Sequence, residues 1–229
     1  MTTVVCHQPD FVPYLGFFDR LLDADVFVIL DDVQFLRRGW HHRDRIKTRD
    51  GADWLTLSVE KAPRETAIKD IRLADAANGW IDGNLNLLRA NYAAAPHFAT
   101  IMPQVEALYR RPAATLLELN MAFLDWAYGL FDLRPSVVLS SSLAVESTAN
   151  QRLIDLVQAV GGDSYLSGTG ALDYLDPGVW CESGIKLTVQ RFEHPCYSQL
   201  HGGFEPYLSC LDLFFNCAPD AAAILRSGR

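Results

Sequence analysis

The sequence predicts an α/β protein with a mostly parallel sheet, flanking helices and a helical insertion at about residues 78–131. Short, continuously apolar segments alternate with amphipathic ones, which is typical of βαβ units. The insertion, in contrast, has helical periodicity only. The chain has 229 residues, 49% of them hydrophobic, and this is enough for a sizeable core. We therefore expect a single domain over residues 1–229, with 78–131 as a helical subdomain.

The first βαβ unit occupies about the first 30 residues. TVVC (3–6) predicts a short buried strand. VFVILDD (26–32) is apolar on both faces, as a central parallel strand is. Between them, helical spacing places these apolar residues on one face: Leu15, Phe18, Leu21 and Leu22. Such a unit is right-handed by default.

The later elements follow in chain order. Residues 54–61 and 67–74 alternate in polarity, which predicts an antiparallel pair or a sheet edge. In the helical insertion, breaks fall near Pro96 and Pro112, and the last helix is apolar nearly all round, so we expect it to be buried. The remaining predictions are a strand at SVVLSS, a helix at 148–160 capped by Ser147 or Thr148, strands at SYLSG and 184–192, and a short helix capped by Ser209.

Composition limits the class of protein. The net charge of −8 argues against a large nucleic-acid interface, and no apolar run approaches the roughly 20 residues of a membrane span. The N-terminus has no secretory signal pattern, and the five cysteines form no C-x-x-C pair. These features favour a cytoplasmic protein with reduced thiols.

Polar residues follow each apolar strand. In open α/β sheets, ligands bind outside the carboxyl ends of the parallel strands. We therefore expect a site where the following residues converge: His7-Gln8-Pro9, Asp31-Asp32 with Gln34, Ser140 to Ser142, and Ser167 to Gly170.

His7 is the predicted general base, since histidine titrates near neutral pH. The alternative is a structural turn residue. Asp31 and Asp32 are predicted to orient a substrate group or bind Mg²⁺. Neighbouring strand residues point to opposite faces, so at most one of the two carboxylates enters a site. The alternative for this pair is a helix cap or a salt bridge.

A basic run, RRGWHHRDRIK (37–47), stands out in an acidic chain. Arginine forks match the oxygens of phosphate and carboxylate, so the run predicts an anion pocket, with a solvated loop as the alternative. A zinc site from Cys6, His41 and His42 has no supporting ligand spacing, and no metal site is predicted.

The glycines after the SYLSG strand do not identify a cofactor. Gly168 and Gly170 form only G-x-G, so neither a Rossmann fingerprint nor a P-loop is present. The backbone amides at this turn are nevertheless able to bind an anion.

Three long stretches together resemble the WbqC-like protein family: HQPDFVPYLGFFDRLLDADVFVILDDVQF with the W-x-x-R-x-R-I-K run from Trp40, RLIDLVQAVGGDSYLSGTGALDYLD, and HPCYSQLHGGFEPYLSCLDLFFN. Trp40 and Arg43 match the family pattern, while His41, His42 and Asp44 depart from it. The resemblance implies a role in O-antigen, other surface-polysaccharide or specialised-metabolite pathways. It implies a transferase that moves an acyl or aminoacyl group onto an amine, and it brings no agreed set of catalytic residues.

Motif position and chemistry together predict a small-molecule transferase acting on an amine or hydroxyl of a sugar or amino-acid-like acceptor. The alternatives are a nucleotidyl-transfer or adenylation enzyme and a non-catalytic scaffold of a biosynthetic complex. The substrate is expected to carry a phosphate or carboxylate, and a pathway protein is a possible partner. The catalytic candidates are His7, Asp31 and Asp32. The candidates for substrate binding are Gln8, Tyr14, Gln34, Trp40, Arg43, Arg45, Lys47, Ser167, Gly168, Tyr197 and Gln199.

Overall fold

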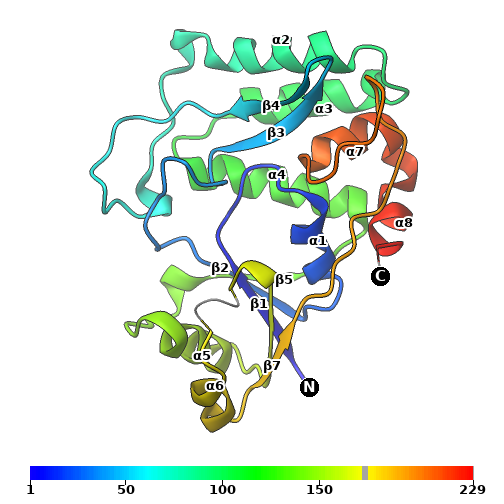
Figure 1. Ribbon diagram of the computed structural model, residues 1–229. Coiled ribbons are helices and arrows are strands. Elements are labelled where there is room, and N and C mark those ends of the chain that lie inside the picture. The colour runs from blue at the N-terminus through cyan, green and yellow to red at the C-terminus, as the bar shows by residue number, and fades with distance from the viewer. Residues whose placement is uncertain (172–174, 229) are drawn as a thin grey trace.

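The computed structural model describes residues 1–171 and 175–228, and its α/β architecture confirms the predicted fold class (Figure 1). Its centre is a five-stranded sheet in the order β5-β2-β1-β6-β7, in which every neighbouring pair is parallel. The strands are β1 (Thr3–His7), β2 (Val26–Ile29), β5 (Ser136–Leu139), β6 (Ser164–Ser167) and β7 (Lys186–Val189).

The strand order contains one reversal. From β1 the chain adds β2 and then β5 on one side, and it then crosses to the other side of β1 to add β6 and β7. The loops that leave β1 and β6 therefore diverge to opposite faces of the sheet. Such a switch point leaves a crevice at the carboxyl ends of the two strands, which is where ligands bind in doubly wound sheets.

Helices cover both faces of the sheet (Figure 1). Val4 and Cys6 of β1 pack in a core cluster with α5 (Ala149–Ala159) and α6 (Pro177–Ser183). Val5 belongs to the larger core cluster on the other face, which includes α1 (Leu15–Leu21) and α4 (Leu116–Phe131). Successive strand side chains point to opposite faces, so His7 projects toward the α1 side.

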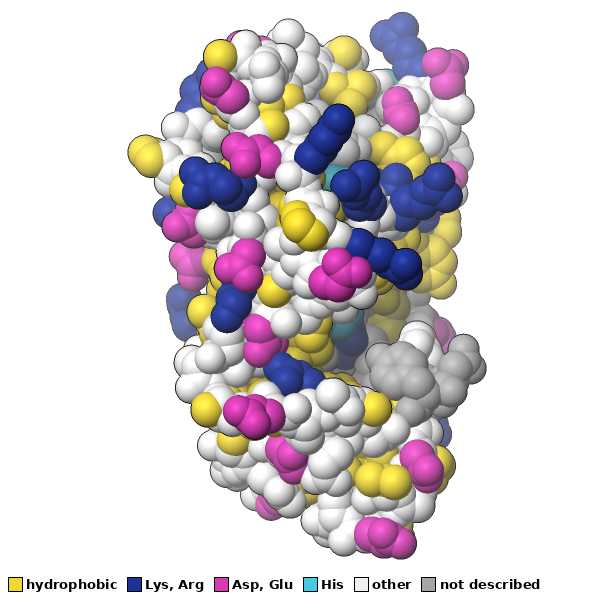
Figure 2. All heavy atoms as spheres, turned by 90° about the vertical axis from the view of Figure 1, so that its left-hand side faces the viewer, with side chains coloured by type: hydrophobic (Ala, Val, Ile, Leu, Met, Phe, Trp, Pro, Cys, Tyr) yellow, Lys and Arg dark blue, Asp and Glu magenta, His cyan; other side chains and the backbone are white. Residues whose placement is uncertain are grey.

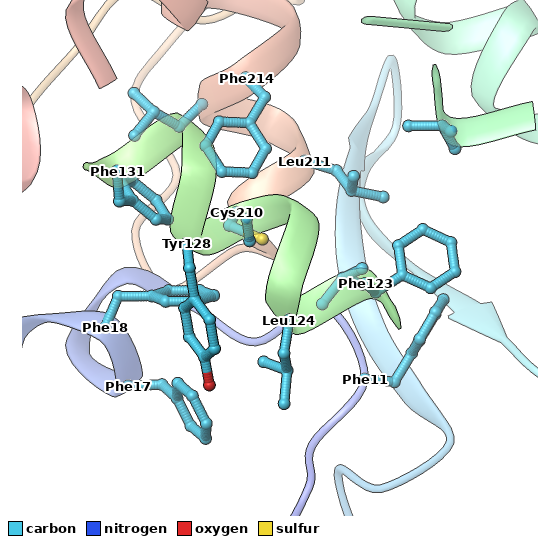
Figure 3. Packing of buried hydrophobic residues seen from close by; sticks show 14 of the residues in the cluster. Phe11, Phe17, Phe18, Phe123, Leu124, Tyr128, Phe131, Cys210, Leu211 and Phe214 are labelled. Carbon is cyan, nitrogen blue, oxygen red and sulfur yellow. The ribbon is translucent and has the colours of Figure 1, made fainter. Parts of the chain in front are cut away.

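The predicted helical insertion contains α2 (Trp80–Tyr92), α3 (Phe98–Arg110) and α4. A capping box fixes the start of α4, because the Thr115 side chain accepts from the Glu118 amide and Glu118 accepts from the Thr115 amide. Side chains of α1, α4 and α7 (Cys210–Cys217) meet in one buried cluster (Figure 3). The helix α4 is thus the buried layer that joins the insertion to the sheet.

The predicted pairing of 54–61 with 67–74 is wrong for most of its length. Instead β3 (Arg43–Thr48) and β4 (Gly51–Thr56) form an antiparallel hairpin. Only an isolated bridge, Val59 to Leu73, joins the two segments expected to pair. Because β3 has charged side chains at Arg43, Asp44, Arg45 and Lys47, it lacks the apolar alternation from which a strand is predicted.

The remaining elements are short. One is α8 (Ala221–Arg226), which packs against α4 and α1. The 3-10 turns are Ile68–Asp70, Ala76–Asn78, Ser140–Ser142, Thr169–Ala171 and Ala218–Asp220. Within the described ranges, every helix is too short or too polar to cross a membrane.

Candidate active site

A cavity of about 520 Å³ lies at the carboxyl ends of β1 and β6, at the switch point of the sheet. Small-molecule sites commonly have volumes of roughly 300–1,000 Å³. The lining residues come from the ends of β1 and β6, the turn after β6, the loop before α1, α1 itself, β3 with the loop before it, and the segment before α7. They are Cys6, His7, Gln8, Asp10, Pro13, Tyr14, Arg20, Trp40, Asp44, Arg45, Tyr165, Ser167, Gly168, Thr169, Gly170, Ala171 and Tyr207.

The loop after β1 is held in an unusual backbone conformation. Val12 has a φ of 38°, which a β-branched residue rarely adopts. The hydroxyl of Ser209, the cap of α7, donates to the Val12 carbonyl at 2.7 Å, and the Cys210 amide donates to the Pro13 carbonyl at 3.1 Å. The start of α7 therefore fixes this loop, and strain retained beside a cavity is common at functional sites.

A carboxylate lies between two histidines at the cavity. The Asp10 carboxylate is 3.2 Å from His41 Nδ1 and 3.6 Å from His7 Nδ1. His7 Nδ1 is also 3.0 Å from the Gln8 carbonyl, to which it donates when protonated, and this leaves the Nε2 lone pair available. Burial, assisted by the nearby Arg20 charge, lowers the pKa of His7 to about 4. His7 is therefore a neutral imidazole at neutral pH and is able to accept a proton.

An asparagine of α4 holds the two loops that carry this cluster. Asn120 is fully buried, and its Nδ2 donates to the Pro9 carbonyl at 2.7 Å and to the His41 carbonyl at 2.6 Å. Its Oδ1 is buried without a hydrogen-bond partner. The helical insertion thus positions His7, Asp10 and His41 through one side chain.

Asp44 and Arg45 of β3 also line the cavity. Asp44 is 2% exposed, and its Oδ1 accepts from the Arg45 amide at 2.6 Å. Burial, together with the charge of Asp10, raises the pKa of Asp44 well above its usual range, and this favours the protonated form of the carboxyl group. The Arg45 guanidinium donates to the Tyr207 carbonyl at 3.3 Å, while its Nε has no partner among the described residues. A base, an acid and a cation therefore share one cavity.

Seven of the fourteen residues predicted for the site line this cavity. The structure brings together the predicted residues His7, Gln8, Tyr14, Trp40, Arg45, Ser167 and Gly168. The sequence pattern does not predict the lining residues Asp10, Arg20, Asp44, Tyr165 and Tyr207. Asp10 had a usable signal, since it stands three residues after His7 in the same stiff loop, whereas Arg20 has the pattern of an ordinary helix residue.

Asp31 and Asp32 lie away from the cavity. Asp31 accepts from the Ser141 amide at 3.0 Å and from the Ser141 hydroxyl at 2.7 Å. Asp32 forms an ion pair with Arg152 of α5 at 2.8 Å and accepts from the Ser140 hydroxyl. Burial opposes ionisation of Asp32, but these hydrogen bonds outweigh it and lower the pKa. The two carboxylates bind the end of β2 to the turn after β5. Asp32 therefore forms a salt bridge, which was the alternative to a role in the site.

Lys47, Tyr197 and Gln199 form a separate buried network. Lys47 Nζ donates to Gln199 Oε1 at 3.0 Å and to the carbonyls of Gly202 and Gly203. The Tyr197 hydroxyl donates to Asp212 Oδ2 at 2.9 Å. These contacts fix the segment before α7, and none of the three residues lines the cavity.

The rest of the basic run lies outside the cavity. The Arg43 guanidinium stacks over the Trp54 ring at 4.1 Å, and Trp54 also contacts Trp40. Gln34 donates to the Arg64 carbonyl at 2.7 Å, and it lines a second hollow of about 870 Å³ together with Arg37 and Arg38. Figure 2 shows Lys and Arg side chains gathered on the upper part of one face of the molecule.

Among residues 1–171 and 175–228, no group of three or more His, Cys, Asp or Glu side chains is arranged to hold a metal ion.

The fold and the cavity define a doubly wound α/β protein with ionisable groups gathered at the switch point of its sheet. The chain belongs to the WbqC-like protein family, whose sequence model matches residues 8–224. It is 33% identical, over 99% of its length and 98% of the relative's, to a protein of Mycobacterium tuberculosis (strain ATCC 25618 / H37Rv) named uncharacterized protein Rv1507c. No solved structure matches the chain.

Proposed function

We propose that this protein is a transferase of a polysaccharide or specialised-metabolite pathway, which moves an acyl or aminoacyl group onto an amine or hydroxyl of a sugar or amino-acid-like acceptor. Membership of the WbqC-like family fits a biosynthetic role. The observation that carries the proposal is that one cavity is lined by a histidine, a buried carboxyl group with a raised pKa and a guanidinium: His7, Asp44 and Arg45.

In the proposed reaction, His7 Nε2 removes a proton from the acceptor amine or hydroxyl as that group attacks the carbonyl carbon of the donor. The imidazolium that forms is stabilised by the Asp10 carboxylate next to it. Arg45 stabilises the negative charge that develops on the carbonyl oxygen. As the bond to the leaving group breaks, the Asp44 carboxyl group gives that group its proton. Proton exchange with water then returns both residues to their starting states.

The experiment begins with a thermal-shift screen of the purified chain against acyl-CoAs, nucleotide sugars, ATP and amino acids. A compound present at 100 times its Kd stabilises the fold by about 2.7 kcal/mol, which such a screen detects. Pairs of hits are then incubated together, and the acylated product is measured by mass spectrometry. General-base catalysis contributes about 10²–10⁴-fold, so His7→Gln is expected to lower kcat by that factor.

His97→Gln is the matched control, because His97 is half-buried at the start of α3 and lies outside the cavity. It is expected to leave kcat unchanged. Full turnover by His7→Gln would refute the role of His7. If every donor and acceptor pair that binds gave no product, the transferase proposal itself would be refuted.

Nucleotidyl transfer or adenylation is the second candidate, and the place of the cavity favours it. Doubly wound sheets bind nucleotides at their switch points, and this cavity lies at one. Calorimetry with ATP and Mg²⁺ and a pyrophosphate-release assay with added amino acids test it. Absence of binding at millimolar ATP would remove this candidate.

A further inference from the structure

Arg20 is a buried cation that forms none of the direct ion pairs among the described residues, although the carboxylates of Asp10 and Asp19 lie near enough to act on its charge. It lies in the last turn of α1, is 6% exposed and lines the cavity. Its Nε is buried without a hydrogen-bond partner among the described residues. Its guanidinium lies over the Phe17 ring, 5.9 Å from the centroid. A buried guanidinium with an unsatisfied N–H group and no direct ion pair costs free energy, and a ligand anion in the cavity would offset that cost.

The guanidinium of Arg20 faces the turn after β6. A Cβ atom added to Gly168 would lie 2.6 Å from Arg20 Nη1, so only glycine allows this approach. Within the described ranges, the amides of Gly168, Thr169 and Gly170 donate no backbone hydrogen bond. Successive free amides at such a turn form an anion-binding concavity. Guanidinium and amide donors therefore meet at one end of the cavity.

The donors at this end of the cavity fit a phosphoryl group better than a carboxylate. A carboxylate has two oxygens, whereas a terminal phosphoryl group offers three to a guanidinium fork and several amides. A second guanidinium group, that of Arg45, also lines the cavity and is able to contact another oxygen of the same substrate.

We propose that Arg20 and the backbone amides of Gly168–Gly170 bind a phosphoryl group of the substrate. This inference rests on the proposed function, since it places the substrate in the same cavity. It gives the substrate a chemical class, a phosphate ester or diphosphate, and it identifies the end of the cavity that holds the phosphorus. The reacting carbonyl group then lies toward His7 and Asp44.

The experiment compares wild type with Arg20→Met, which retains the length of the side chain and removes its charge. Pyrophosphate, inorganic phosphate and acetate are titrated by calorimetry at constant ionic strength. We expect pyrophosphate to bind wild type and Arg20→Met to bind it 10- to 100-fold more weakly, as expected when a charge-assisted hydrogen bond is lost. Arg134→Met is the control, because Arg134 is exposed and precedes β5, away from the cavity, and it should bind as wild type does.

Thermal unfolding in buffer without phosphate separates binding from structure. If Arg20 serves a ligand, Arg20→Met is expected to have a Tm equal to or above that of wild type, because a buried charge with no direct ion pair and an unsatisfied Nε is removed. A lower Tm would show that Arg20 is structural and would overturn the proposal. Equal pyrophosphate affinity in wild type and Arg20→Met, or tighter binding of acetate than of pyrophosphate, would also overturn it.

Gly168→Ala tests the same site without a change of charge. The new Cβ would displace the Arg20 guanidinium, so pyrophosphate binding is expected to fall by at least 10-fold. Gly129→Ala is its control, since a Cβ at this position of α4 meets nothing within 4 Å. Unchanged affinity in Gly168→Ala would count against the proposal. Pyrophosphate binding that depends on Arg20 without any turnover would leave this site standing and refute only the transferase.

Discussion

Replacing Asn120 by alanine would remove the contact between the helical insertion and the two loops of the cavity. Each of the carbonyls of Pro9 and His41 then loses a buried donor. An unsatisfied buried carbonyl costs about 1–3 kcal/mol. Removing the unpartnered Oδ1 of Asn120 returns about 1 kcal/mol, so the net loss of unfolding free energy is about 1–5 kcal/mol. For a chain of this size this lowers Tm by roughly 2–20 °C.

Urea unfolding followed by circular dichroism measures this loss as a fall in the midpoint at constant m value. Asn91→Ala is the control, because the Asn91 amide donates only to Leu87 of its own helix, and its change should stay within about 0.5 kcal/mol. If the unfolding free energy of Asn120→Ala lay within about 0.5 kcal/mol of wild type, the loops would have another support and the reasoning would be refuted.

Other predictions concern pH, an ion pair and a helix cap. Burial holds the pKa values of His7 and His42 at about 4, so between about pH 4 and 6.5 the unfolded chain binds more protons than the folded one. Urea unfolding should therefore show stability rising with pH across this window, by up to about 1.4 kcal/mol per pH unit for each histidine, and a flat profile would contradict it. Asp32→Asn weakens the ion pair with Arg152, so it should lower the unfolding free energy by about 1–3 kcal/mol. Its pyrophosphate affinity should equal that of wild type. Weaker pyrophosphate binding at unchanged stability would contradict the place of Asp32 outside the cavity. Ser209→Ala removes the α7 cap and should cost about 0.5–2 kcal/mol in thermal unfolding, and an unchanged Tm would refute its role.

The sheet could be predicted from sequence because its strands are short apolar runs between helical segments. Their carboxyl ends carry His7 and Ser167, which do meet at the cavity. Asp31 also follows an apolar strand, but it binds Ser141 at the neighbouring end of β5. Periodicity identifies the strands and leaves their spatial order open, and that order decides which ends meet.

The residues that the sequence analysis missed are polar groups in buried positions. Arg20 lies in α1, where apolar spacing identifies one face, yet the structure buries every residue from Leu15 to Leu21. Asp44 occupies an inward position of β3 that would ordinarily be apolar, and Lys47 is buried against Gln199 rather than free to bind an anion. Burial of a charge depends on the elements packed around it, so no local pattern reveals it.

The central place of β1 in the sheet affects how the protein assembles during synthesis. One edge of β1 pairs with β2 soon after both strands leave the ribosome, but the other edge waits for β6, about 160 residues later. At typical rates of synthesis this delay is on the order of ten seconds. During that time β1 presents unpaired amides and carbonyls, the kind of edge through which chains aggregate. The strand that ends in His7 is therefore also the part of the nascent chain most in need of protection.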